Sequence, residues 1–191
     1  MDYAHVRSEI ATGDLLLFRG RHPISRVIQW RTKSVFSHVG IAVWVQIENT
    51  KRLGVLEAKE GWGVRLYPLS QCLEIGDHVD WFRVVDSSID STVAAGWAME
   101  QWGKQYASLW QFIRSFGLFG LSKRLLDALR IPTKVDHDRW FCSCFAAQFL
   151  LAGGWHPDED VDPSLTPPGD VALFPCLHRR GVLTLETGTH S

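Results

Sequence analysis

The sequence predicts an α+β protein with helices packed on one side of an antiparallel sheet or partial barrel. In the first half, short apolar runs are separated by turn residues, as is typical of strands. In the second half, longer stretches carry apolar residues at helical spacing. Because strands and helices are segregated rather than alternating, an antiparallel sheet is favoured. The 191 residues predict a single domain, 1–191, with its core at about 13–175.

The strongest strand signal is Val39–Val45, a β-branched and apolar run typical of a central strand. Asn49–Arg52 is expected to form a hairpin turn that returns the chain as a second strand, Leu53–Ala58. Residues 1–12 show neither pattern and are expected to be a loose lead-in. Further predicted strands cover residues 15–18, 63–67 and 79–85, with closing strands at 171–174 and 182–185.

Four segments are predicted to be helical. Ile24–Trp30 is expected to form a short helix, and Ser91–Gln105 a longer one with an apolar stripe. Residues 108–131, rich in Leu and Phe, are predicted to be a helical insertion or lid that packs on the core or contacts a membrane. The last helix lies within Trp140–Trp155 and ends at a pair of glycines.

Cys142 lies near the amino end of this last helix. Unpaired backbone N–H groups and the helix dipole favour a negative charge there, and a nearby imidazolium lowers a thiol pKa further. The same N–H groups are placed to hold an oxyanion. Two readings stay open from the residues alone: a nucleophile, or a small buried core residue.

A thiol nucleophile needs a base within about 3 Å and a group that orients the base. His38 opens the Val39–Val45 strand, where its position would be fixed. Glu57 lies in the returning strand and can be its neighbour across the hairpin. Glu60 is an alternative orienter, and His137 is a competing histidine in a polar linker.

Charge and composition exclude several classes. The formal net charge of −1 gives no case for nucleic acid as a partner. There is no signal-peptide pattern and no apolar run long enough to cross a membrane, so a cytoplasmic protein with reduced cysteines is expected. No cysteine pair has zinc-site spacing, and neither a metal nor another cofactor is expected.

Five segments in this order carry a family resemblance: TGDLLLF, SHVGIAV, VLEA with GVRLYPL, GKQY and FCSCFAAQFLLAGGW. The chain resembles the circularly permuted branch of the NlpC-type papain-like hydrolases, the YiiX/YebB-like amidases, which are distantly related to lecithin retinol acyltransferase-like proteins. In that branch the histidine strand precedes the cysteine helix. The resemblance implies a permuted papain-like fold over about residues 13–154.

The resemblance implies that Cys142 is the nucleophile, His38 the general base and Glu57 the third member of a triad. It also marks Ser37 and Tyr106 as candidate substrate contacts. The chain departs from the family pattern at Cys144 and Ala107, where acidic residues are common. The predicted function is a cysteine hydrolase acting on an amide bond through a thioester, with peptidoglycan-type peptides as one substrate class.

Two alternatives accompany this prediction. The first is a lipid-directed acyl hydrolase or acyltransferase with peripheral membrane contact, suggested by the Phe- and Leu-rich segment 108–129 and the nine Trp residues. The second is a non-catalytic binding module that keeps the fold with an unreactive cysteine.

Overall fold

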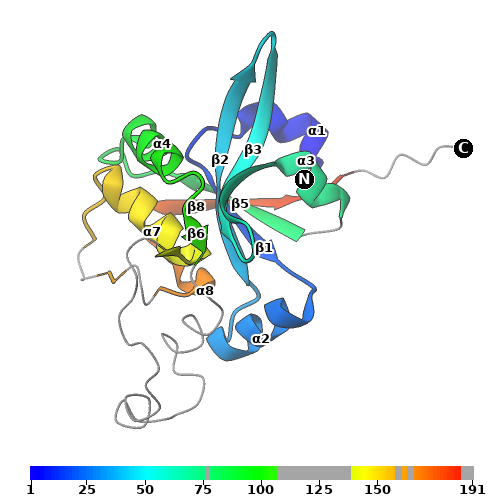
Figure 1. Ribbon diagram of the computed structural model, residues 1–191, viewed down its shortest axis with the longest axis vertical. Coiled ribbons are helices and arrows are strands. Elements are labelled where there is room, and N and C mark those ends of the chain that lie inside the picture. Colours follow the sequence, from blue (N-terminus) through cyan, green and yellow to red (C-terminus); the bar gives the residue numbers. More distant parts are fainter. Residues whose placement is uncertain (76–77, 107–138, 158–160, 163–165, 186–191) are drawn as a thin grey trace, which may run out of the picture.

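A six-stranded antiparallel sheet forms the centre of the protein, with strand order β4-β3-β2-β1-β5-β8 (Figure 1). The computed structural model describes residues 1–75, 78–106, 139–157, 161–162 and 166–185. The strands are β1 (Leu15–Arg19), β2 (His38–Ile47), β3 (Thr50–Lys59), β4 (Gly63–Pro68), β5 (His78–Val84) and β8 (Leu177–Leu183). Two short strands, β6 (Gln105–Tyr106) and β7 (Arg139–Trp140), pair in parallel beside it.

Helices cover both faces of this sheet. On one face α4 (Ser91–Glu100) and α7 (Cys142–Ala152) pack on alternate residues of the central strands, such as Leu17, Val39 and Ile41. On the other face lie α1 (Tyr3–Val6) and α3 (Leu69–Glu74), which pack on the intervening residues. In the described part of the chain, the remaining helical elements are η1 (Arg7–Glu9), α2 (Pro23–Thr32) and α8 (Pro168–Val171). The predicted α+β class and its antiparallel sheet are confirmed. The prediction that helices pack on one side only is wrong, because the short helices α1 and α3 cover the second face.

Helix α7 is apolar on nearly every side because it is buried between the sheet and α4. Every residue from Cys142 to Ala147 is buried. The backbone N–H of Gly153 closes the last turn, and Gly154 follows with a φ of 101°, in the region that favours glycine. The predicted helix and its glycine stop are therefore confirmed.

The lead-in and one closing strand differ from prediction. Residues 1–12 are packed rather than loose: Tyr3, Val6 and Ile10 are buried against the sheet, and the Asp2 carboxylate accepts from the N–H of Ala4. The two turns of this segment are too short to show helical periodicity in the sequence. Residues 168–171 form helix α8, not a strand starting at 171, because a proline at the first position pre-sets the helical φ.

Two further predictions differ in extent or cannot be compared. The closing strand predicted at 182–185 is the end of β8, which starts five residues earlier. The predicted insertion or lid at 108–131 lies outside the described residues, as does His137.

Candidate active site

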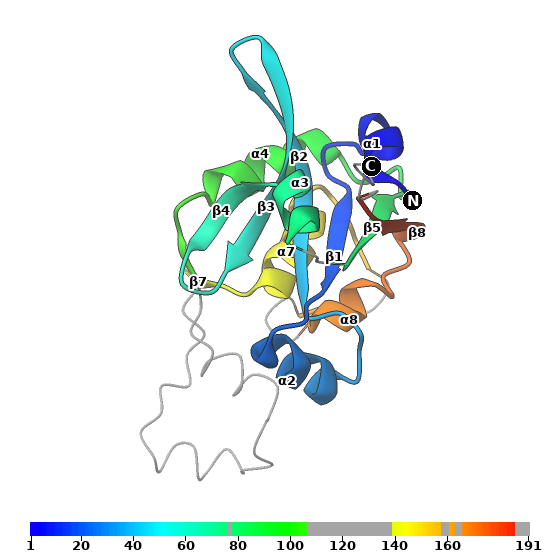
Figure 2. The same ribbon diagram turned by 90° about the vertical axis from the view of Figure 1, so that its right-hand side faces the viewer.

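The candidate site forms where strands β2 and β3 stop pairing. Their ladder extends from Ile47↔Thr50 at the hairpin turn to Ile41↔Leu56, so His38, Val39 and Gly40 extend past it. The N–H of Val39, left without a partner on β3, donates to the Cys142 sulfur at the start of α7. The end of the β2–β3 pairing thus leaves the Val39 N–H available to the Cys142 sulfur. Figure 2 shows α7 running behind β2 at this level.

The Cys142 sulfur is surrounded by donors. Cys142 is the first residue of α7 and is 3% exposed. Its sulfur accepts from the backbone N–H of Ser143 as well as that of Val39, and it contacts the His38 ring through a hydrogen bond. Burial opposes the thiolate, but the charge and hydrogen bond of His38, together with the two backbone donors, lower the pKa of Cys142.

The His38 ring bridges the thiol and a carboxylate. Nε2 of His38 lies 2.5 Å from Oε2 of Glu57, which leaves Nδ1 for the thiol. Burial disfavours the imidazolium, but the negative charges of Cys142 and Glu57 outweigh that effect and raise the pKa of His38 to about 9. The Phe18 ring, with its centroid 5.3 Å from that of His38, limits the rotation of the imidazole.

Arg65 binds the other carboxylate oxygen of Glu57, Oε1. Nε and Nη2 of Arg65 donate to Oε1 of Glu57 at 2.9 and 2.8 Å, and the two residues are directly paired across β3 and β4. Glu57 itself is 1% exposed. Burial favours its neutral form, but His38, Lys59 and Arg65 together lower the pKa of Glu57 to about 2. The carboxylate therefore stays charged at neutral pH.

Two aromatic rings flank the Arg65 guanidinium. Its Cζ lies 4.6 Å from the Tyr67 ring centroid and 5.1 Å from that of Trp62. These contacts fix the plane of the guanidinium through cation–π attraction, so the guanidinium can present a rigid pair of donors. Thiol, imidazole, carboxylate and guanidinium form one chain of contacts.

The neighbouring cysteines differ from Cys142. Burial, with the charges of Asp162 and Cys142, raises the pKa of Cys144 to about 12. Burial likewise raises the pKa of Cys176 to about 12. Both therefore stay protonated at neutral pH, whereas Cys142 has the opposite shift.

The candidate substrate contacts lie in different environments. The Ser37 hydroxyl is 4% exposed, accepts from the N–H of Gly20 at 3.1 Å and donates to the carbonyl of Phe18 at 3.4 Å. It therefore secures the loop before β2. The backbone of Tyr106 lies in β6, and its side chain is outside the described part of the structure. Substrate contact by either residue stays a prediction. Glu60, the alternative orienter, is exposed in the turn between β3 and β4.

Three features of this site were missed in the sequence. Arg65 could have been found by continuing the hairpin from Glu57 around the Gly61 turn, which pairs the two residues. Gly40 could not, because its importance is steric: a Cβ there would lie 2.3 Å from Cγ1 of Val55 and 3.4 Å from Cβ of Glu57. The Val39 N–H is available because the β2–β3 pairing ends before it, and a residue pattern does not indicate where strand pairing ends.

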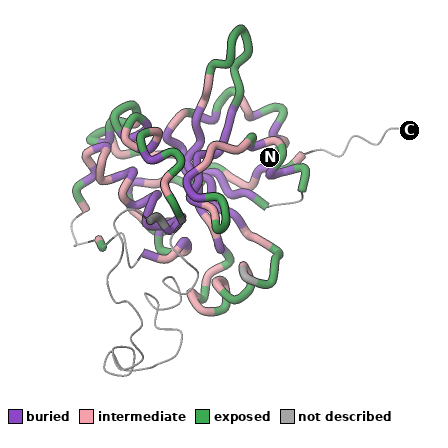
Figure 3. Tube along the Cα trace, viewed as in Figure 1, coloured by how far each residue is buried: buried purple, intermediate pink, exposed green. Residues whose placement is uncertain are grey.

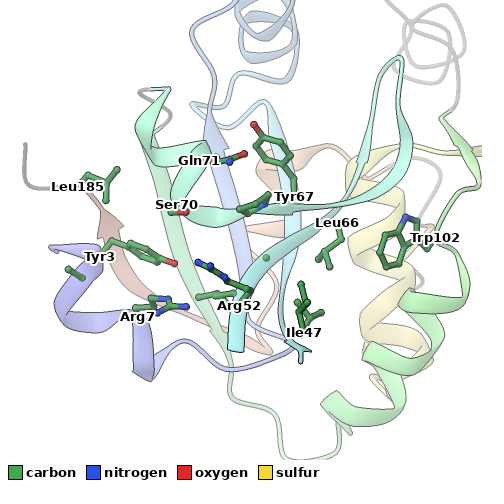
Figure 4. Close-up of a pocket in the computed structure, with 15 residues that line it drawn as sticks. Tyr3, Arg7, Ile47, Arg52, Leu66, Tyr67, Ser70, Gln71, Trp102 and Leu185 are labelled. Atoms are coloured by element: carbon green, nitrogen blue, oxygen red, sulfur yellow. The ribbon is translucent and has the colours of Figure 1, made fainter. Parts of the chain in front are cut away.

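A concavity with a volume of about 930 Å³ lies at the turn end of the β2–β3 hairpin, away from His38 (Figure 4). Tyr3, Arg7, Arg52, Tyr67 and Trp102 are among its lining residues. It shares Tyr67 with the Arg65 contacts, but none of Cys142, His38 and Glu57 lines it. This groove is therefore separate from the candidate active site.

The described residues lack two kinds of feature. They contain no group of three or more His, Cys, Asp or Glu side chains arranged to hold a metal ion. No helix among them has the length and apolar character needed to cross a membrane.

A buried cysteine at a helix N-terminus, in contact with a histidine that a carboxylate holds, is the constellation of a cysteine hydrolase. Comparison with protein families leads to the same class. The chain belongs to the permuted papain-like amidases of the YaeF/YiiX type, the C92 family, whose model matches residues 9–114. The matched segment contains His38, Glu57 and Arg65 and ends before Cys142. The predicted family is thereby confirmed.

A solved structure agrees with this fold. The crystal structure described as metalloprotein yiiX from Escherichia coli O157:H7 is similar to this chain with a TM-score of 0.51 and 24% sequence identity. The similarity covers 74% of this chain and 65% of that one, so this chain spans just under two thirds of its length. A comparison with curated proteins found no match.

Proposed function

We propose that this protein is a cysteine amidase or peptidase that cleaves its substrate through a thioester on Cys142. The observation that carries the proposal is the unbroken chain of contacts from the Cys142 thiol through His38 to Glu57. Membership of an amidase family supports the reaction class. The roles of the three side chains are supported by their geometry and by the direction of each pKa shift.

In the proposed first half-reaction, His38 holds the proton of Cys142 as an imidazolium. The thiolate attacks the amide carbon and forms a C–S bond, and the carbonyl oxygen becomes an oxyanion. The N–H of Cys142, at the first position of α7, is a candidate donor to that oxygen. His38 then gives its proton to the leaving nitrogen as the C–N bond breaks.

In the second half-reaction, neutral His38 takes a proton from a water molecule, which attacks the thioester carbon. The C–S bond breaks, the acid product leaves, and the proton on His38 restores the starting ion pair. Glu57 keeps the imidazole oriented and stabilises its positive charge in both steps. Arg65 holds Glu57 in turn and prevents it from rotating away from Nε2.

No step is assigned to a metal ion. The similar crystal structure is described as that of a metalloprotein, but the described residues of this chain do not form a group that fits a metal. The proposed substrate is a peptide or other amide, and peptidoglycan-type peptides are the first to screen. The predicted cytoplasmic location and the lipid-ester alternative remain predictions.

The rate of iodoacetamide alkylation at Cys142 as a function of pH tests the proposal. Fragment-ion mass spectrometry separates Cys142 from Cys144, which is the internal control. We expect Cys142 to react well below pH 8 in the parent, and only near a free-thiol pKa of about 8.5 in His38→Ala. Cys144 should stay unreactive in both. Equal pH profiles for parent and variant would reject the ion pair.

A turnover assay completes this test. We expect folded Cys142→Ala to have lost amide hydrolysis while Cys144→Ser keeps it. Hydrolysis by folded Cys142→Ala at the parent rate would rule the proposal out.

A further inference from the structure

Helix α2 exposes an apolar stripe to solvent, whereas a surface helix usually turns its apolar stripe toward the core. Pro23, Val27 and Trp30 follow one another at i, i+4 and i+7, which places them on one stripe. This stripe faces solvent: Val27 is 44% exposed and Trp30 is 75% exposed. Figure 3 shows exposed positions along this helix, which stands away from the sheet in Figures 1 and 2.

Polar contacts attach α2 to the rest of the protein. Nε2 of Gln29 donates to the carbonyl of Gly20 at 3.1 Å and to that of Val35 at 2.8 Å, which ties the helix to the segments before and after it. The Thr32 hydroxyl donates to the Ile28 carbonyl one turn back. The attachment of α2 therefore depends on hydrogen bonds, and its apolar stripe is not used for internal packing.

Positive charge surrounds this stripe. Arg26 and Arg31 project on either side of it by helical geometry. From Leu15 to Ile47 the chain has five Lys and Arg residues (Arg19, Arg21, Arg26, Arg31, Lys33) and no Asp or Glu; of the five, Arg19 lies on β1 and is ion-paired with Asp80. With a net charge of −1 over all 191 residues, the cations of this segment are a local concentration and not a general property of the chain. The exposed Val35, 55% accessible, extends the apolar surface past the helix end.

We propose that α2 and the segment through Val35 form a docking surface for an anionic lipid bilayer. A short apolar stripe bearing Trp and flanked by Arg is the pattern of a helix that lies in the membrane interface. The Trp and Val side chains enter the boundary between headgroups and acyl chains, while the cations contact phosphates. Charge complementarity favours this partner over an acid-poor protein groove, which would offer the cations of α2 no anionic group to pair with.

The position of this surface connects it to the candidate site. The loop after α2 continues through Phe36 and Ser37 directly into His38 at the start of β2. Docking through α2 would therefore bring this end of the sheet close to a lipid surface. The proposal does not depend on the chemistry of Cys142, because binding can be measured without turnover.

Vesicle flotation tests the proposal with the full chain. The probes are vesicles of phosphatidylglycerol mixed with phosphatidylcholine, and vesicles of phosphatidylcholine alone. We expect flotation with the anionic vesicles, weakened by high salt, and little with the neutral ones. Trp30→Ser and Arg26→Glu should each lower the partition coefficient by about tenfold. The matched control is Trp102→Ser, which removes another exposed Trp, on a loop remote from α2, and should bind as the parent does.

Several outcomes would overturn the proposal. These are no flotation of the parent at low salt, equal binding to both vesicle types, or an equal loss in Trp102→Ser. Light scattering without lipid tests whether the stripe binds a second copy of the chain instead. If the parent is a dimer and Trp30→Ser is a monomer, the stripe is a dimer interface and the lipid proposal is wrong. Loss of flotation in folded Trp30→Ser, with unchanged mass, supports the lipid surface.

Discussion

Asp80 and Glu57 are both buried carboxylates that bind arginine, but only Glu57 belongs to the candidate active site. Asp80 on β5 is fully buried and receives Nε and Nη2 of Arg19 at 2.7 and 2.8 Å and Nε of Arg179 at 2.6 Å. Glu57 on β3 is also buried. Its Oε1 accepts from Arg65, but its Oε2 faces His38. The arginines saturate Asp80, whereas Glu57 has one oxygen left for a group that can change its charge.

This difference shows how to separate scaffold from site. A buried carboxylate paired with arginine alone holds neighbouring strands together. A buried carboxylate shared between an arginine and a histidine fixes the direction of the imidazole and favours its charged form. Removing either carboxylate should therefore affect different observables, and four experiments test that difference.

The largest effect is expected from comparing Glu57→Gln with Asp80→Asn. Because Gln cannot stabilise the imidazolium, we expect Glu57→Gln to lower kcat by about 10²–10⁴-fold. Asp80→Asn leaves two guanidiniums without a counter-charge and should lower the free energy of unfolding by about 2–4 kcal/mol while the folded protein keeps its kcat. Urea unfolding and amide turnover measure the two effects. Loss of turnover by folded Asp80→Asn would contradict the assignment of Asp80 to the scaffold and Glu57 to the site.

The second effect concerns pH. The pKa of His38 is raised from 6.5 to about 9 in the folded protein, so its protonation stabilises the fold. That contribution is complete below about pH 6.5 and is lost as the pH rises through about 9. We expect the difference in unfolding free energy between parent and His38→Gln to shrink across this window. Chemical denaturation at several pH values measures it, and a difference that is constant with pH contradicts the shift.

Arg65→Lys should have a smaller effect. Lysine keeps the charge but loses the paired donors and the planar contact with Tyr67 and Trp62. We expect kcat/KM to fall about tenfold. The acid limb of the pH profile should move upward as the pKa of Glu57 returns from about 2 toward its ordinary value.

Arg179→Lys at the Asp80 cluster is the matched control and should leave the pH profile unchanged. A purely structural role for Arg65 would lower stability without moving the acid limb.

The smallest effect is expected at a glycine beside Glu57. Gly40→Ala places a methyl group against Val55, and overpacking there should lower the free energy of unfolding by about 1–3 kcal/mol. Gly96→Ala is the control, because a Cβ at this exposed position on α4 meets nothing within 4 Å and should add about 0.5–1 kcal/mol. Thermal unfolding compares them. Equal stability in the two variants would show that the strands beside Glu57 can move apart freely.

Much of this arrangement was predictable where the pattern was long or local. Helix α7 showed an apolar run with a glycine stop, and the hairpin from β2 to β3 brought His38 near Glu57. Short elements such as α1 and α3 were not predictable, because four to six residues do not establish a helical period.

What the sequence could not provide is contact across the fold. The Asp80 cluster joins Arg19 and Arg179, which are distant in the chain, and no local pattern indicates that they meet. The sulfur of Cys142 likewise meets a backbone N–H more than one hundred residues earlier, at a place where a ladder ends. Such contacts between residues distant in the sequence form only when the whole sheet is assembled.

The order of the site residues along the chain has a consequence for biosynthesis. The hairpin that carries His38, Glu57 and Arg65 is complete by residue 68, whereas Cys142 arrives with a helix more than seventy residues later. Since chains emerge from the ribosome amino end first, His38 and Glu57 are synthesised well before Cys142. Under the proposed mechanism, the polypeptide can therefore become reactive only when α7 docks.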